Sequence, residues 1–201
     1  MKTDDLGGKL FIISAPSGCG KTTLCKKLLK DKLGLEHSVS VTTRPPRDNE
    51  KSGIDYIFVS SAAFRDMVKR GEFLEYESNF GYFYGTPKRK VEAVLRKGKA
   101  IILSIDVKGA MKVKKSLPGD SVLIFILPPS IKALKKRLLA RMSDGVEAIS
   151  TRLNLAKKEM AYKDKYDYAL VNDRLDAAYR KLKNIIIAEL NLNRPHKLWP
   201  H

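Results

Sequence analysis

The sequence predicts an α/β protein in which helices flank a mostly parallel sheet on both faces. Strand-like apolar runs alternate along the chain with amphipathic, helix-like stretches, which is the pattern of strands joined by helical crossovers. Between about residues 38 and 94 the pattern changes to short alternating strands, which indicates an inserted lobe. The length of 201 residues fits one such domain, on a prior of about 100 to 200 residues per domain.

The elements of the main sheet follow from these runs. Strands are expected over residues 9–14, 100–106, 122–127 and 168–171. Helices are expected over residues 21–33, 107–116, 130–141, 146–162 and 175–193. Because ligands of such sheets bind beyond the carboxyl ends of the strands, we expect a site where the first, second and fourth of these strands end.

The inserted lobe is expected to contain partly antiparallel strands over residues 39–42, 56–59 and 73–76. Pro45, Pro46, Gly53 and Gly81 separate these strands, as turn residues do. A second irregular segment, residues 141–145, joins two of the expected helices and is suited to act as a hinge.

A loop of small residues joins the first expected strand to the first helix. Its glycines let backbone N–H groups approach phosphate oxygens at the positive end of the helix. Lys21 is placed to reach the β and γ phosphates, and Thr22 to hold Mg²⁺. The strict phosphate-loop pattern begins with glycine, whereas this chain has Ala15. The predicted contacts of a nucleoside triphosphate are Ala15, Pro16, Ser17, Gly18, Cys19, Gly20, Lys21, Thr22 and Thr23.

The formal net charge of +17 is high, and it is compatible with binding to nucleic acid, to a membrane surface or to small anions. The basic clusters recur on expected helix faces, which favours solvated surfaces, and the sequence contains no recognised nucleic-acid motif. No run approaches the roughly 18 apolar residues of a membrane span. Cys19 lies in the loop and Cys25 lies just after it, where a disulfide would compete with the helix geometry. Both cysteines are therefore expected to be reduced. We therefore expect a cytoplasmic protein with no membrane partner and no specific nucleic-acid partner.

Six motifs along the chain together resemble the guanylate kinase family. They are Ser17-Gly18-Cys19-Gly20-Lys21-Thr22, Ser40-Val41-Thr42-Thr43-Arg44-Pro45-Pro46-Arg47, Gly53-Ile54-Asp55-Tyr56, Phe73-Leu74-Glu75, Tyr82-Phe83-Tyr84-Gly85-Thr86 and Ile105-Asp106-Val107-Lys108-Gly109. The resemblance covers about residues 10–190. It implies the P-loop nucleoside-monophosphate-kinase fold and transfer of the γ-phosphoryl group of ATP to GMP, and to dGMP. One domain is then expected, with a core over about residues 8–37, 95–136 and 160–195, a GMP-binding lobe over about 38–94 and a lid over about 137–159.

The chemistry of guanine agrees with this resemblance. Guanine offers two adjacent donors beside an acceptor, so a carboxylate next to hydroxyl groups is its complement. Glu75 with Ser40 and Thr86 supplies that set. The phosphate of GMP would be bound by two arginines and two tyrosine hydroxyls, and Asp106 would orient GMP or a water molecule bound to Mg²⁺. The residues with these phosphate-binding roles are Arg44, Arg47, Tyr56 and Tyr84.

The resemblance also implies a lid whose arginines close over the transferring phosphoryl group. The matching positions are Arg137, Arg141 and Arg152. Asn172 matches a family position near the adenine of ATP, although a turn residue is an equally good reading of it. One departure bears on the site, because Ser104 stands where the family usually has the first of two aspartates.

Other functions remain open on the sequence alone. Some relatives keep this fold as a peptide-binding scaffold, but their phosphate loops are degraded, whereas Lys21 and Thr22 are present here. A basic nucleic-acid-binding protein would rest on net charge alone. A different acceptor is disfavoured by Glu75 with Ser40. Both a monomer and a homodimer are compatible with the sequence.

Overall fold

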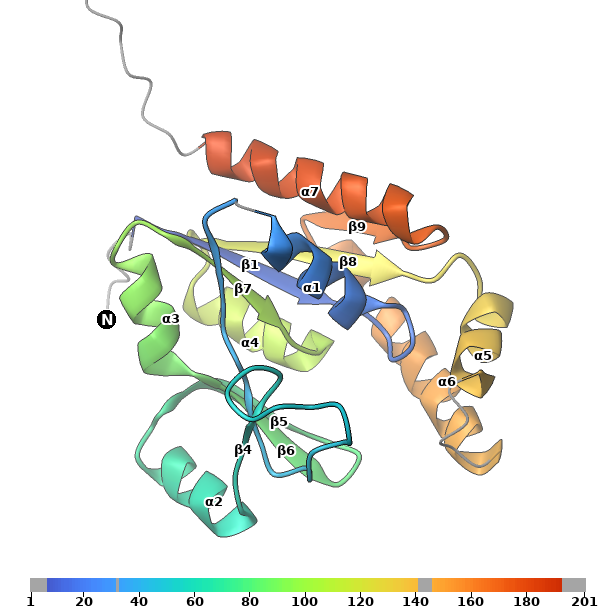
Figure 1. Cartoon of the computed structure of the whole chain (residues 1–201), viewed down its shortest axis with the longest axis horizontal. Coiled ribbons are helices and arrows are strands. Elements are labelled where there is room, and N and C mark those ends of the chain that lie inside the picture. The colour runs from blue at the N-terminus through green and yellow to red at the C-terminus, as the bar shows by residue number, and fades with distance from the viewer. Residues whose placement is uncertain (1–6, 32, 141–145, 193–201) are drawn as a thin grey trace, which may run out of the picture.

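The computed structural model describes residues 7–31, 33–140 and 146–192. Five parallel strands form the main sheet in the order β2-β7-β1-β8-β9, which confirms the predicted α/β class. Figure 1 shows this sheet in the middle of the molecule. The strands are β1 (Lys9–Ser14), β2 (Leu35–His37), β7 (Ala100–Ser104), β8 (Ser121–Leu127) and β9 (Tyr168–Val171).

The central strand β1 is apolar on both sides because both faces of the sheet are covered. Leu10 and Ile12 belong to one buried cluster, and Phe11 and Ile13 belong to the other. The first cluster includes residues of α3 (Lys88–Leu95) and α4 (Val107–Ser116), and the second includes residues of α1 (Lys21–Lys30) and α7 (Leu175–Leu192). The loops at the carboxyl ends of the strands are thereby held on a rigid support.

A second, four-stranded sheet forms the inserted lobe, in the order β4-β3-β6-β5. Its β3–β6 and β5–β6 pairs are antiparallel, and β3–β4 is parallel, so the lobe is partly antiparallel as predicted. Phe64 of α2 stacks on Phe73 and Phe83 and closes one face of this sheet. The elements are β3 (Val41–Thr42), β4 (Ile57–Phe58), α2 (Ser61–Lys69), β5 (Phe73–Asn79) and β6 (Tyr82–Pro87).

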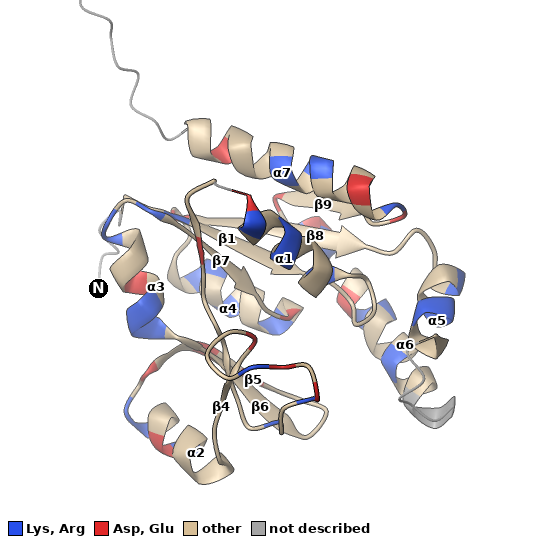
Figure 2. Cartoon of the chain, viewed as in Figure 1, with Lys and Arg blue, Asp and Glu red and all other residues tan. Residues whose placement is uncertain are grey.

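Two helices, α5 (Ile131–Leu139) and α6 (Val146–Met160), pack on each other beside the carboxyl end of β8, at the right of Figure 1. A short 3-10 helix, η1 (Lys163–Lys165), leads from α6 into β9. None of the described helices is both long and apolar enough to cross a membrane. Figure 2 shows Lys and Arg spread over several helices in this view, as expected for solvated faces.

The structure differs from the predicted boundaries for local reasons. Strand β7 stops at Ser104 because the side chain of Asp106 accepts a hydrogen bond from Gly109 N and begins α4. Helix α1 ends at Lys30, since Asp31 is extended. Strand β2 was not predicted, because three residues carry too little pattern. The helices α2 and α3 were also missed, although Ser60 caps α2 by accepting from Ala63 N.

Candidate active site

The phosphate loop, residues 15–20, runs from the end of β1 to the start of α1. Gly18 and Gly20 have φ of 91° and 83°, in the left-handed region that favours glycine. Ala15 has no positive φ and is buried, so the alanine found in place of the first pattern glycine causes no backbone strain. The loop therefore has the backbone shape of an anion-binding site at a helix N-terminus.

Asn172, which follows β9, holds this loop in place. Its buried side-chain amide Nδ2 donates to Cys19 O at 2.8 Å. A Cβ on Gly20 would lie 2.6 Å from the same nitrogen, so glycine is required there for space as well as for φ. The structure thus gives Asn172 a loop-supporting contact in addition to the adenine contact implied by the resemblance.

Lys21 begins α1 and points to the end of β7. Its Nζ donates to Ile105 O at 2.9 Å. Burial lowers the pKa of the Lys21 amine below its ordinary value, while Cys25 and nearby carboxylates act in the opposite direction. Among these carboxylates is Asp106, so the loop lysine and the end of β7 share one electrostatic environment.

Glu75 and Thr86 form the polar centre of the inserted lobe. They lie opposite each other on β5 and β6, and Thr86 Oγ1 donates to Glu75 Oε1 at 2.5 Å. Both are buried. Burial raises the pKa of the Glu75 carboxyl to about 7, and the charges of Asp106 and Glu77 add to the shift, whereas the hydrogen bond from Thr86 opposes it.

Gly109 of α4 leaves room for the Glu75 carboxylate. A Cβ at Gly109 would lie 2.5 Å from Glu75 Oε2. This contact joins the inserted lobe to the main core, because α4 belongs to the core and β5 to the lobe. The sequence shows Gly109 only as part of a family motif, and its steric role depends on the approach of Glu75 in the folded chain.

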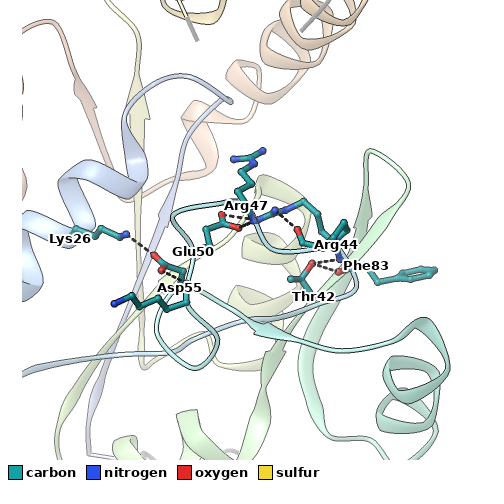
Figure 3. A network of polar contacts seen from close by, with 9 residues as sticks. Lys26, Thr42, Arg44, Arg47, Glu50, Asp55 and Phe83 are labelled. Carbon is teal, nitrogen blue, oxygen red and sulfur yellow. Dashed lines mark hydrogen bonds and ion pairs between the residues drawn. The ribbon is translucent and has the colours of Figure 1, made fainter. Parts of the chain in front are cut away.

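The four residues predicted to bind the acceptor phosphate lie near one another. The Arg44 guanidinium carbon lies 5.4 Å from the centre of the Tyr56 ring, and the Tyr56 and Tyr84 rings are 6.0 Å apart in an edge arrangement. Arg47 lies on the same loop as Arg44, and its guanidinium points away from the loop in Figure 3. Ser40 is half-buried just before β3. The predicted acceptor residues thus come together in one lobe.

The two predicted lid arginines that the structure describes contact different parts of the protein. Arg137 of α5 donates from Nη2 to Asn172 O at 2.9 Å and to Asp173 O at 3.2 Å. Arg152 of α6 lies over the ring of Phe80, at 5.6 Å, on the turn between β5 and β6. Arg141 lies outside the described residues. A cleft of about 360 Å³ beside Phe80 separates this turn from α6.

One buried carboxylate near the loop was missed by the sequence analysis. Glu159 of α6 is 8% exposed, and its Oε2 has no hydrogen-bond partner among the described residues. Burial raises the pKa of Glu159 to about 7, and the positive charge of Lys21 acts against that shift. No local pattern marks this glutamate, because its burial depends on how α6 packs against the core.

The arrangement of the phosphate loop and the inserted lobe identifies the class of protein. A glycine loop and lysine after the first parallel strand, facing a lobe with a buried carboxylate and arginines, are the parts of a P-loop kinase with a separate acceptor lobe. The family model for guanylate kinase matches residues 7–189. The chain belongs to the guanylate kinase family and is therefore a nucleoside monophosphate kinase.

Individual relatives agree with this assignment. The chain is 47% identical to a guanylate kinase of Clostridium tetani, over 90% of this chain and 86% of the relative. It is 43% identical to a guanylate kinase of Caulobacter vibrioides, over 96% of this chain and 90% of the relative. A crystal structure of guanylate kinase from Anaplasma phagocytophilum superposes with a TM-score of 0.78 at 36% identity, covering 91% of this chain and 86% of that one.

GMP binding should weaken below pH 7. Because the pKa of Glu75 is raised to about 7 in the free protein, the ionised form that can accept two guanine donors is the major form only above that pH. We expect the Kd of GMP to rise roughly tenfold for each unit of pH below 7. Calorimetric titration from pH 8 to pH 5.5 measures this. Glu75→Gln should retain only the shallower dependence caused by the GMP phosphate, whose second pKa is about 6; an equally steep profile in that variant would contradict the assignment.

Gly109→Ala should impair GMP binding with little effect on folding. The new Cβ would displace a carboxylate that Thr86 holds, and displacements of this size cost about tenfold to a hundredfold in binding or rate. We expect the Kd of GMP to rise at least about tenfold while the Kd of ATP and the Tm stay near those of the wild type. Gly119→Ala is the matched control, because its Cβ would meet nothing within 4 Å. Unchanged GMP affinity in Gly109→Ala would show that Glu75 does not need its present position.

Proposed function

We propose that this enzyme transfers the γ-phosphoryl group of ATP to GMP, and also to dGMP, giving ADP and GDP or dGDP. The observation that carries the proposal is Glu75, a buried carboxylate paired with Thr86 in the lobe that contacts the core through α4. An ionised carboxylate accepts from the N1–H and 2-amino groups of guanine. Adenine would present an acceptor at N1, which leaves the buried carboxylate without the pair of donors that guanine offers, so the lobe favours GMP over AMP.

Phosphoryl transfer needs alignment and neutralisation of charge, and no nucleophilic side chain. A phosphate oxygen of GMP attacks the γ-phosphorus of ATP, and the bond to the β,γ-bridging oxygen breaks, so that ADP leaves with that oxygen. Arg44, Arg47, Tyr56 and Tyr84 would hold the attacking phosphate. Lys21, together with the N–H groups of the phosphate loop, would stabilise the negative charge on the β and γ phosphates.

Mg²⁺ fits this site as a companion of ATP. In the described part of the chain, no three His, Cys, Asp or Glu side chains come together to hold a metal ion. Mg²⁺ binds mainly through nucleotide phosphates and keeps several waters, so one or two oxygen groups of the protein suffice to hold it. The exposed Thr22 hydroxyl would be its protein ligand, and the Asp106 carboxylate would hold one of its waters. When bound, the ion would neutralise charge on the β and γ oxygens.

The lid is proposed to comprise about residues 137–159 and to bring Arg137, Arg141 and Arg152 over the transferring group. Closure would also exclude water, which would otherwise accept the phosphoryl group. For Arg137 and Arg152 this requires leaving the loop after β9 and the Phe80 ring. We place the enzyme in the cytoplasm, and Cys19 and Cys25 are buried and form no disulfide, as expected in a reducing compartment.

A coupled assay of ADP formation tests the proposed function. With ATP as donor, GMP and dGMP should be turned over, and AMP, CMP and UMP should give at most about 1% of the kcat/KM of GMP, which is a difference of about 3 kcal/mol. Folded protein that binds GMP without turnover would favour a binding scaffold. Preferential turnover of AMP would contradict the role of Glu75.

Lys21→Ala should abolish most turnover and leave GMP binding intact. Removing one charge-stabilising donor from a transition state typically costs about 100- to 1000-fold in kcat. We expect a loss of that size with a Kd of GMP close to that of the wild type. Lys30→Ala is the control, because this exposed lysine ends the same helix far from the loop. An unaltered kcat in Lys21→Ala would remove the proposed role of the lysine.

A further inference from the structure

Glu50 lies at the centre of the loop between β3 and β4 that carries Arg44 and Arg47 (Figure 3). Arg44 Nη2 donates to both oxygens of the Glu50 carboxylate, at 2.8 Å and 2.7 Å. The backbone N of Arg47 donates to Oε2 of the same carboxylate at 3.0 Å. One carboxylate therefore holds the side chain of one arginine and the backbone of the other.

The second half of the loop is held by bonds of its own, such as Gly53 N to Tyr56 O, whereas the turn that carries Arg47 is held through Glu50. Pro45 and Pro46 have no backbone N–H to donate. One backbone bond, from Glu50 N to Arg47 O at 2.9 Å, closes the turn in which Arg47 lies. The carboxylate of Glu50 also accepts from Arg47 N, so both the N–H and the C=O of Arg47 bond to Glu50. The position of Arg47 is thus tied to Glu50 through the backbone.

Arg44 is held in one orientation by its surroundings. Its side chain is 12% exposed and its guanidinium lies near the rings of Tyr56 and Phe58, at 5.4 Å and 5.9 Å. Nη1 donates to Pro45 O at 2.7 Å. Burial alone would raise the pKa of Glu50, but the Arg47 amide and Arg44 keep it below its ordinary value, so the carboxylate is charged at neutral pH. A charged partner that accepts from Nη2 with both oxygens holds that end of the guanidinium more firmly than a neutral partner would.

Two roles are conceivable for such a carboxylate beside a phosphate site. It could occupy Arg44 in place of the phosphate and be displaced when GMP binds, or it could hold Arg44 ready and stay in place. The second role fits the contacts, because displacement of Glu50 would also break its bond to Arg47 N and loosen the turn. The two roles predict opposite effects of removing the charge on GMP affinity.

We propose that Glu50 is a positioning residue for the acceptor phosphate, which sets Arg44 and Arg47 in their binding geometry before the phosphate monoester arrives. The proposal rests on the proposed function, since it takes these arginines to bind the phosphate of GMP. Glu50 does not touch the substrate, and its contribution passes entirely through the two arginines. Its effect should therefore appear only with ligands that carry the phosphate.

The test compares GMP with guanosine in the full-length protein and in Glu50→Gln. Glutamine keeps the shape of the side chain and one acceptor, but it loses the charge and the bidentate pairing. We expect the Kd of GMP to rise about tenfold or more, the change typical of losing one charged hydrogen-bonded contact, while the Kd of guanosine, measured by ligand NMR, stays unchanged. The kcat/KM for GMP should fall by the same factor at an unchanged KM for ATP.

Glu72→Gln is the matched control, because Glu72 also pairs with an arginine of the same lobe, Arg70, but at an exposed site. It should leave both affinities unaltered. Equal GMP affinity in Glu50→Gln and wild type would overturn the proposal, and tighter GMP binding would show that Glu50 competes with the phosphate. Equal losses of GMP and guanosine affinity would indicate that Glu50 only supports the fold of the lobe. If the wild type itself neither bound nor phosphorylated GMP, the proposed function would fail, and that result is distinct from these outcomes.

Discussion

The backbone of the phosphate loop is the constraint on which the donor side of the enzyme depends. Its left-handed glycines shape the loop, and the absence of a Cβ at Gly20 lets Asn172 approach and donate to Cys19 O. Lys21 reaches across to Ile105 O at the end of the neighbouring strand. The ends of β1, β7 and β9 are therefore joined by polar contacts to backbone carbonyls. With that framework held by a sheet buried on both faces, the loop N–H groups can keep a geometry suited to phosphates.

The proposed specificity for guanine depends on Glu75, a carboxylate whose burial is unfavourable when it is charged. Desolvation raises the pKa of Glu75 to about 7, which means that burial disfavours the ionised carboxylate. The donors of a guanine base would stabilise that ionised form. The pKa of Glu159, whose carboxylate interacts with Lys21, is raised in the same way by burial. Ser104, where the family usually has an aspartate, adds no charge to this environment. Burial and the charges of neighbouring groups shift the pKa values of Lys21, Glu75 and Glu159 around this site.

The arginines of the inserted lobe and those of the proposed lid have different surroundings. Arg44 is held by Glu50 and lies near two aromatic rings, so its position is fixed by contacts within the lobe. Arg137 and Arg152 instead contact a backbone carbonyl and the Phe80 ring, on separate walls of the site. Preorganised groups suit the binding of a substrate, whereas groups that move together suit a step that must wait for both substrates.

The sequence by itself determined the class of fold and the position of the phosphate loop, and it predicted Glu75, Ser40 and Thr86 as guanine-reading residues, because apolar periodicity, glycine spacing and motifs are readable along the chain. It also placed β1, β9 and α4 at their observed limits. Only the tertiary structure showed that Gly109 makes space for Glu75, that Asn172 supports the loop and that Glu50 joins two arginines. The Gly109 and Asn172 contacts join residues far apart in sequence, and the role of Glu50 depends on how its loop closes. These contacts depend on burial and on distances in the folded chain, which no local sequence pattern encodes.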